Sequence, residues 1–109
     1  MTTVIFFTEG PRITGFDVKG HSGFAPEGQD IVCAAITSAV RLVECTVNDV
    51  MGLSAAANVY PREAKIVFRL PGGLAPGAEN TCQSVLTGLM VYLTELHGEY
   101  PEKIEVLEA

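Results

Sequence analysis

A histidine and a cysteine twelve positions apart are the residues of this sequence best suited to chemistry. His21 lies in a glycine-rich stretch, and Cys33 follows where a helix is expected to begin. A thiol is a poor nucleophile until it loses its proton, and a helix N-terminus or a nearby imidazole promotes that loss. Because this stretch could supply both, Cys33 and His21 are the candidate nucleophile and general base.

The helix that would carry Cys33 is expected over residues 30–51, with Asp30 as its N-cap and Gly52 as its stop. Cys33 then lies in the first turn, whose unpaired amides present about half a positive charge. Asp30 has two interpretations: it caps the helix, or it orients His21 as a third catalytic group. A carboxylate near Cys33 would raise the pKa of the thiol, and protonated His21 would have to offset that effect.

Four further residues have competing interpretations. Thr37 lies one turn after Cys33, so its hydroxyl could contact a substrate or bond back to its own helix. Cys45 and Cys82 have no histidine close to them in the sequence and are expected to be small buried residues. His97, beside Gly98, is expected to cap a helix C-terminus. Spacing alone leaves Cys33 open between a catalytic thiol and a buried core residue.

The sequence gives little support for a metal or cofactor. His21, Asp30 and Cys33 could make three ligands, but their spacing matches no familiar metal motif. The glycines are not followed by lysine and serine or threonine in P-loop order. The three cysteines include no Cys-x-x-Cys pair, so a thiol redox sensor would lack an obvious resolving partner. We therefore expect neither a metal nor a cofactor.

Length and charge restrict the class of protein. The 109 residues suit one domain, over residues 1–109, and the formal net charge is −6. An acidic chain is not expected to bind nucleic acid directly, and a basic partner suits it better. The N-terminus lacks a basic signal region, and no apolar run approaches the ~20 residues that span a bilayer. These features predict a cytoplasmic protein with reduced thiols and no membrane partner.

The hydrophobic pattern predicts strands over residues 2–8, 13–19, 54–60, 63–70 and 102–107, and helices over residues 30–51 and 79–97. The order is ββαββαβ. Such an order favours an α+β, two-layer fold, with a mainly antiparallel sheet and two helices packed on one face. Met90 and Tyr92 lie beside the apolar face of the second helix. They indicate either a partner surface, such as that of a homodimer, or completion of the core.

At the glycine-rich stretch the sequence resembles a known family, the bacterial ribosomal-processing cysteine proteases, or Prp. The family signature is Gly-His followed by Asp-Ile-Val-Cys-Ala, which stands here as Gly20-His21 and residues 30–34. The length and the ββαββαβ order are similar over nearly the whole chain. The resemblance implies a cysteine endopeptidase that removes an N-terminal extension from a large-subunit ribosomal protein, a basic precursor.

The resemblance also implies roles for individual residues. The positions that match Cys33 and His21 are the nucleophile and the general base, and Thr37 stands where some members have serine. Gly20, Ser22 and Gly23 are expected to shape the loop or contact the substrate. The family is typically a homodimer with a mobile loop over the site, here residues 22–27. The alternative is a non-enzymatic ribosome-associated binding or assembly protein, which would keep its partner when Cys33 and His21 are replaced.

Overall fold

The structure, a computed structural model, describes residues 1–20 and 31–109. In chain order the elements are β1 Thr2–Glu9, β2 Arg12–Lys19, α1 Ile31–Glu44, β3 Ala56–Tyr60, β4 Lys65–Arg69, α2 Pro76–Glu99 and β5 Ile104–Glu108. A π-helical segment, η1 (Cys45–Val50), continues α1, and a short 3-10 turn, η2 (Pro61–Glu63), joins β3 to β4. The predicted ββαββαβ order is confirmed.

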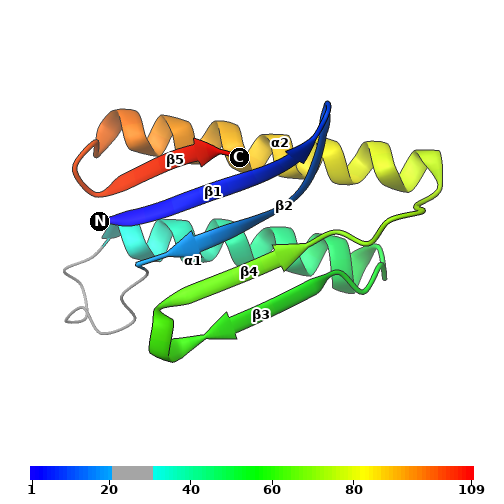
Figure 1. The fold of residues 1–109 in the computed structure, drawn as a ribbon, viewed down its shortest axis with the longest axis horizontal. Helices are drawn as coiled ribbons and strands as arrows, with labels where there is room; N and C mark the ends of the chain where they lie inside the picture. The colour runs from blue at the N-terminus through cyan, green and yellow to red at the C-terminus, as the bar shows by residue number, and fades with distance from the viewer. Residues whose placement is uncertain (21–30) are drawn as a thin grey trace.

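The strands form one five-stranded sheet in the order β3-β4-β2-β1-β5. Neighbouring strands are antiparallel except β1 and β5, which are parallel and place Thr2 opposite Ile104. The first and last strands of the chain are therefore side by side (Figure 1). The sheet is mixed but mainly antiparallel, as predicted.

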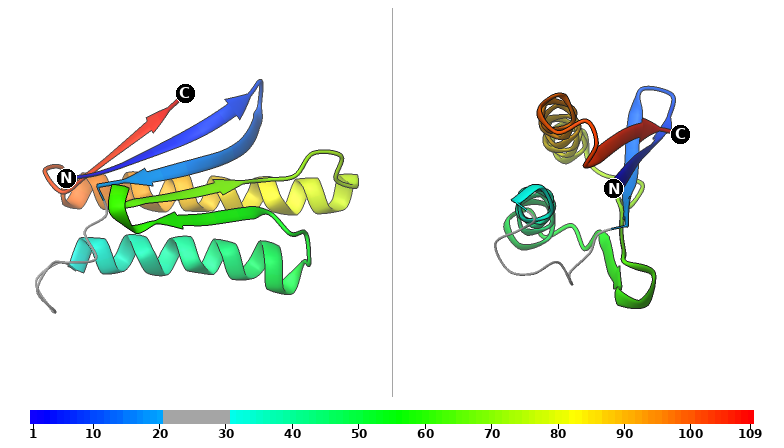
Figure 2. Two further views of the ribbon diagram at one scale, coloured as in Figure 1. Left: turned by 60° about the horizontal axis from the view of Figure 1, so that its bottom comes forward. Right: turned by 90° about the vertical axis from the view of Figure 1, so that its left-hand side faces the viewer.

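Both helices cover the same face of this sheet, which gives two layers (Figure 2). The core between the layers is centred on Phe6, Phe16 and Phe68, which come from three adjacent strands and are 0% exposed. Their ring centroids are 5.7 Å apart for Phe6 and Phe16 and 5.1 Å apart for Phe16 and Phe68. Alternating apolar residues on the strands account for this face, because successive side chains point to opposite sides. The α+β fold class is confirmed.

The expectation that no stretch approaches membrane-spanning length was wrong. Residues Ile31–Val50 form 20 helical residues that are long and apolar enough, by length and composition only, to cross a membrane. Ile36, Val40 and Val47 in this helix are at most 1% exposed and belong to the core cluster shared with the sheet. Small residues stand between the aliphatic ones in this helix. The helix is therefore apolar over a greater length than any uninterrupted run of apolar residues. A core helix of this kind passes the same test.

The turn between β1 and β2 anchors the beginning of α2. Arg12 donates from Nε to Glu79 Oε1 at 2.6 Å and from Nη2 to the Pro71 carbonyl at 2.9 Å. The Gln83 side chain bonds both the amide and the carbonyl of Ile13, at 2.8 and 2.9 Å. The helix begins at Pro76, before the predicted residue 79, because proline at the first position loses no hydrogen bond.

Other boundaries moved where the backbone becomes left-handed. Ser54 has φ 55° and Ala64 has φ 49°, so β3 and β4 begin later than the predicted residues 54 and 63. Neither residue can continue an extended strand at that φ. Met90 packs against the core, which agrees with the interpretation of this pair as core residues. Tyr92 is 42% exposed, which leaves it available to a partner surface.

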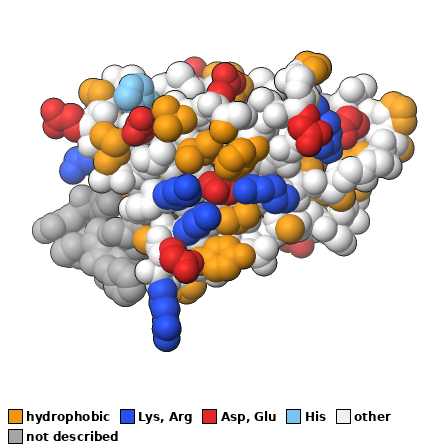
Figure 3. All heavy atoms as spheres, in the orientation of Figure 1, with side chains coloured by type: hydrophobic (Ala, Val, Ile, Leu, Met, Phe, Trp, Pro, Cys, Tyr) orange, Lys and Arg blue, Asp and Glu red, His pale blue; other side chains and the backbone are white. Residues whose placement is uncertain are grey.

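The face of the sheet that the helices leave uncovered carries a small ionic cluster (Figure 3). Asp17 is buried there, 2.8 Å from Arg69 Nη2 and 3.7 Å from Lys65 Nζ. Arg69 also donates from Nη1 to the carbonyls of Phe16 and Phe68, and its guanidinium lies 4.5 Å from the centroid of the Phe7 ring. A buried carboxylate requires such partners, so the cations on this face stabilise the sheet.

Candidate active site

Cys33 is the third residue of α1, the position predicted from the sequence, and it is 8% exposed. The first turn of α1 contains no acidic side chain. The first-turn amides lack intrahelical acceptors and carry the positive end of the helix dipole, which favours a thiolate at this position. Burial opposes that effect, because it disfavours the charged form of the thiol.

Thr37 lies one turn beyond Cys33 on the same side of α1. Its Oγ1 donates to the Cys33 carbonyl at 2.8 Å. This confirms the predicted bond back to its own helix. The hydroxyl ties the first turn to the second and holds the Cys33 backbone in register. The predicted contact of Thr37 with a substrate remains a prediction.

Gly20 ends β2 and leads the chain into residue 21. It has φ +75°, a value that L side chains rarely adopt. A Cβ at this position would lie 2.7 Å from the carbonyl oxygen of Met1, far inside van der Waals contact. Only glycine therefore allows the chain to leave β2 in this direction, immediately before His21.

Several predicted site residues lie outside the described residues: His21, Ser22, Gly23 and Asp30. The His21–Cys33 pair and both interpretations of Asp30 stay predictions. The part of the chain that the structure does describe contains no group of three His, Cys, Asp or Glu side chains arranged to hold a metal ion.

The other two cysteines differ from each other. Cys82 in α2 is 0% exposed, as predicted, and burial together with the nearby Glu79 raises the pKa of its thiol, partly offset by Arg12. The prediction that Cys45 is buried was wrong, because Cys45 is exposed at the start of η1. It lies on the side of the helix away from the sheet, a direction that its apolar neighbours in the sequence do not reveal.

His97 lies in the last turn of α2, where the sequence predicted a capping role. Its Nδ1 is 2.6 Å from the carbonyl oxygen of Ile104, the first residue of β5. The imidazole therefore links the helix end to the following strand and not to the carbonyls of its own helix. This contact with β5 gives His97 a structural role.

Polar side chains recur at helical spacing along α1 and η1, at Arg41, Glu44 and Asn48, and of these only Arg41 is exposed. Glu44 is half-buried, and burial raises the pKa of its carboxyl, partly offset by Arg41. Asn48 accepts from the Ala55 amide at 2.6 Å and donates to the Ala55 carbonyl at 3.0 Å. The spacing of Glu44 from Cys33 and Thr37 is the one signal that could have placed it beside the site.

A cysteine in the first turn of a helix is where a thiol hydrolase would carry its nucleophile, and comparison with known proteins gives the family. Residues 1–105 match the family model described as cysteine protease Prp. The chain belongs to this family and is a cysteine protease. A curated relative, the ribosomal processing cysteine protease Prp of Bacillus subtilis (strain 168), is 29% identical over 94 residues, which cover 86% of this chain and 84% of that protein.

Solved structures show the same fold. The essential ribosomal processing protease Prp from S. aureus, in complex with a substrate peptide, superposes with a TM-score of 0.82 at 19% identity, covering 100% of both chains. SMU.848 from Streptococcus mutans gives a TM-score of 0.83 at 16% identity, covering 99% of this chain and 93% of that one. At these identities the likeness supports the fold alone.

Proposed function

We propose that this cysteine protease removes the N-terminal extension of a large-subunit ribosomal protein precursor. The observation that supports it is Cys33, a buried thiol at the third residue of α1 in a chain that belongs to the cysteine protease Prp family. The Bacillus subtilis relative bears the name of a ribosomal processing protease. The net charge of −6 suits a basic substrate and does not suit nucleic acid, and the three free cysteines suit a reducing, cytoplasmic location.

In the proposed mechanism the Cys33 thiolate attacks the scissile carbonyl carbon and forms a tetrahedral intermediate. The C–N bond then breaks as protonated His21 gives its proton to the leaving amine, which leaves a thioester on Cys33. His21 next takes a proton from water, and the resulting hydroxide attacks the thioester. The acid product leaves and the thiolate returns. Each step uses only the peptide, water and these two side chains.

The oxyanion formed in both steps needs preorganised hydrogen-bond donors. First-turn amides of α1 near Cys33 are suited to this role, because they have no acceptor within the helix. A backbone amide of the glycine-rich stretch would supply a second donor. Gly20 acts as a positioning residue, because it alone permits the backbone direction that leads to His21. In the same scheme Asp30 either caps α1 or orients His21, and Ser22 and Gly23 flank the substrate.

Cleavage of a peptide that spans the extension junction tests this proposal. Cys33→Ala should abolish cleavage, whereas Cys45→Ala and Cys82→Ala should retain it. The two controls remove a thiol from the exposed start of η1 and from the core of α2. Full cleavage by Cys33→Ala would overturn the proposal. Retained binding of the precursor with no cleavage by the wild type would instead favour a ribosome-associated binding protein.

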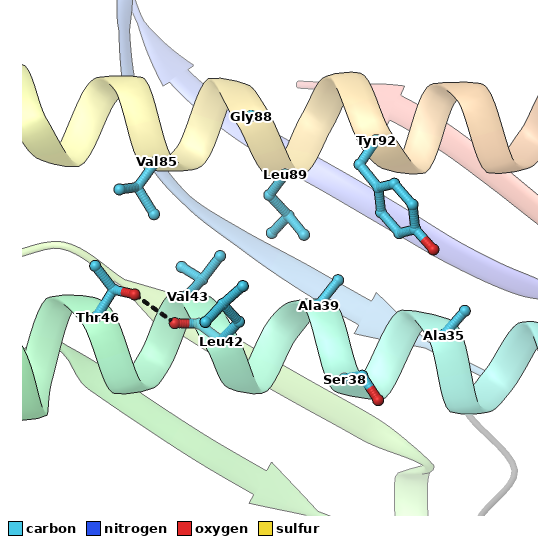
Figure 4. Close-up of a pocket in the computed structure, with 10 residues that line it drawn as sticks. All are labelled: Ala35, Ser38, Ala39, Leu42, Val43, Thr46, Val85, Gly88, Leu89 and Tyr92. Carbon is cyan, nitrogen blue, oxygen red and sulfur yellow. Dashed lines mark hydrogen bonds between the residues drawn. The ribbon is translucent and has the colours of Figure 1, made fainter.

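We also propose that the chain, as one domain of residues 1–109, forms a homodimer through the surface between α1 and α2. A hollow of about 580 Å³ lies there (Figure 4). Its ten lining residues carry no charged side chain: Ala35, Ser38, Ala39, Leu42, Val43, Thr46, Val85, Gly88, Leu89 and Tyr92. Two of these lining residues, Leu42 and Tyr92, are exposed, so the surface offers apolar side chains that a second copy could cover around a two-fold axis.

The oligomeric state of a glycine variant checks the dimer. Gly88 lies in the hollow, and a Cβ there would meet nothing within 4 Å, so Gly88→Arg should dissociate the dimer without disturbing the fold. Gly98→Arg is the matched control, since Gly98 is equally open and lies near the end of α2. Light scattering that reports a wild-type monomer, or two dimeric variants, would contradict this interface.

A further inference from the structure

The two edges of the sheet differ in how they are protected. An edge strand exposes unpaired backbone groups, and proteins usually protect it with charges, proline or a bulge. β5 carries Glu105 and Glu108 at one edge. β3 at the other edge reads Ala-Ala-Asn-Val-Tyr, without charge or proline, and pairs with β4 in regular register. All five β3 residues are exposed, and among residues 1–20 and 31–109 no strand pairs with the outer side of β3.

A stripe of α1 lies on the same side of the molecule as this edge. Cys33, Thr37 and Glu44 recur at helical spacing, and Asn48 in η1 continues the row. Ala35 and Ala39 line the hollow toward α2, and the stripe lies on the opposite flank of the helix. Asn48 bonds both backbone groups of Ala55, immediately before β3.

β3 returns along α1 in the opposite direction. The chain passes from Asn48 through Ala55 into β3, which runs back toward the end of the molecule where α1 begins (Figures 1 and 2). Tyr60, the last residue of β3, therefore lies at the Cys33 end. A chain laid along β3 would extend beside the stripe in the direction of the thiol.

We propose that the substrate peptide binds as an added strand on the β3 edge, beside the α1 stripe, and that Glu44 receives a basic side chain of that peptide. This rests on the proposed protease function. An edge strand pairs only with an extended chain, and a scissile peptide must be extended to be reached. Glu44 lies about 16 Å from Cys33 along the helix, at 1.5 Å per residue. An extended peptide covers that length in about five residues.

The charge of Glu44 supports a cationic partner. Burial raises the pKa of its carboxyl, and Arg41 offsets this only in part. A basic side chain of the peptide would compensate the desolvated carboxylate, as charge-assisted hydrogen bonds do. A precursor of a basic ribosomal protein offers such side chains. The β5 edge, with its glutamates, presents no comparable row beside Cys33.

Amide hydrogen exchange locates the peptide. The Cys33→Ala variant is saturated with a peptide that spans the extension junction, and saturation is followed separately by fluorescence anisotropy. Alternate amides of β3 should exchange at least about tenfold more slowly, while β5 amides, the matched edge, stay unchanged. Unchanged β3 exchange at saturation, or equal protection at β5, overturns the proposal. Protection of β3 by added protein without peptide would assign the edge to a second copy and also overturn it.

The same peptide separates this proposal from the protease function. If the wild type cleaves it and β3 shows no protection, only the β3 site is wrong. If the wild type neither cleaves nor binds it, the proposed function fails together with this inference.

Charge variants test Glu44. Glu44→Gln should lower kcat/KM by about tenfold for a peptide with lysine five residues from the scissile bond. It should leave kcat/KM unchanged for the same peptide with a neutral residue at that position. The Glu44→Lys variant should have a higher kcat/KM for the peptide with glutamate at that position than for the peptide with lysine. Glu99→Gln, an exposed glutamate at the end of α2, is the control. Equal losses for the basic and neutral peptides would show that Glu44 does not read the substrate.

Discussion

Two buried cysteines, Cys33 and Cys82, lie on the two helices packed on the same sheet, and catalysis is predicted for Cys33 alone. Cys33 is the third residue of α1, whose first turn has no acidic side chain. Cys82 lies further along α2, whose first turn carries Glu79. Burial and Glu79 both raise the pKa of the Cys82 thiol. Burial is thus common to both thiols, and within the described residues only the first turn of α2 carries a carboxylate.

The segments that precede the two helices differ as well. α2 follows a short turn and is fixed by Arg12, which donates to Glu79 Oε1 at 2.6 Å. α1 follows Gly20, the glycine-rich stretch and His21 in the sequence. A helix start that is held by an ion pair stabilises the fold, whereas one that follows a histidine and several glycines can assemble a site. We expect the first turn of α1 to favour a thiolate more than the first turn of α2, where Glu79 adds a negative charge.

Alkylation rates test the difference between Cys33 and Cys82 most directly. In the native protein at neutral pH, iodoacetamide should label Cys33 on the order of a hundredfold faster than Cys82, because only the thiolate reacts. Mass spectrometry of peptides from a time course measures both rates, with exposed Cys45 as the internal reference. In denaturant the three thiols should react alike. Equal native rates for Cys33 and Cys82 would remove the distinction.

Replacing His21 should reduce the advantage of Cys33. In His21→Ala the midpoint of the pH profile for Cys33 labelling should rise by about one unit or more, since the imidazolium no longer stabilises the thiolate. That change slows labelling about tenfold at a fixed lower pH. His97→Ala, which removes the imidazole that contacts Ile104, is the control. An unchanged Cys33 profile would rule out the ion pair.

Gly20 and Gly73 lie in the segments that lead into α1 and α2, so their variants compare these two segments. Gly20 has φ +75° and Gly73, before α2, has φ +69°, so alanine meets a similar backbone penalty at both positions. Only at Gly20 would the added Cβ also lie 2.7 Å from a backbone oxygen, whereas Gly73 has nothing within 4 Å. Gly20→Ala should therefore lower kcat/KM by about tenfold, and Gly73→Ala should leave it unchanged. Similar kinetic losses would indicate general destabilisation.

The smallest effect concerns the carboxylates of the two helices. Burial raises the pKa of Glu44 above 4.5, so the folded state favours its protonated form. The contribution to stability is present below pH 4.5 and is lost as pH rises through the folded pKa. Glu44→Gln should thus melt at about the wild-type temperature at pH 4 and slightly higher at pH 7. A Tm difference that is constant with pH would contradict this, and Glu99→Gln provides the baseline.

Much of the fold could be predicted because its signals are local. The alternation in β4 and the aliphatic spacing in α1 set element type and order, and proline and glycine mark most ends. The boundaries that moved lie at Ser54 and Ala64, where a left-handed backbone has no sequence signal. The helix start at Pro76 was missed because its apolar periodicity begins only later.

The site was predicted from the same local signals, with a resemblance added. Cys33 falls in the first turn of α1 because that helix begins at Ile31, as the spacing indicated. Exposure could not be predicted in this way. Cys45 was expected to be buried and is exposed, because packing of the helix against the sheet, and not the neighbouring residues in the sequence, sets which side is covered.

The sequence by itself therefore determined the order of the elements, the helix-start cysteine and the family. The elements and the helix start are set by residues near one another in the chain, and the family by a short motif. The tertiary structure decided which cysteines are buried, that β3 is an edge strand, that Glu44 is half-buried and that Asn48 bonds Ala55. Those properties arise where segments far apart in the sequence meet, as when Arg12 contacts Glu79 or β1 pairs with β5. Burial and pairing depend on these distant neighbours, and no local spacing specifies them.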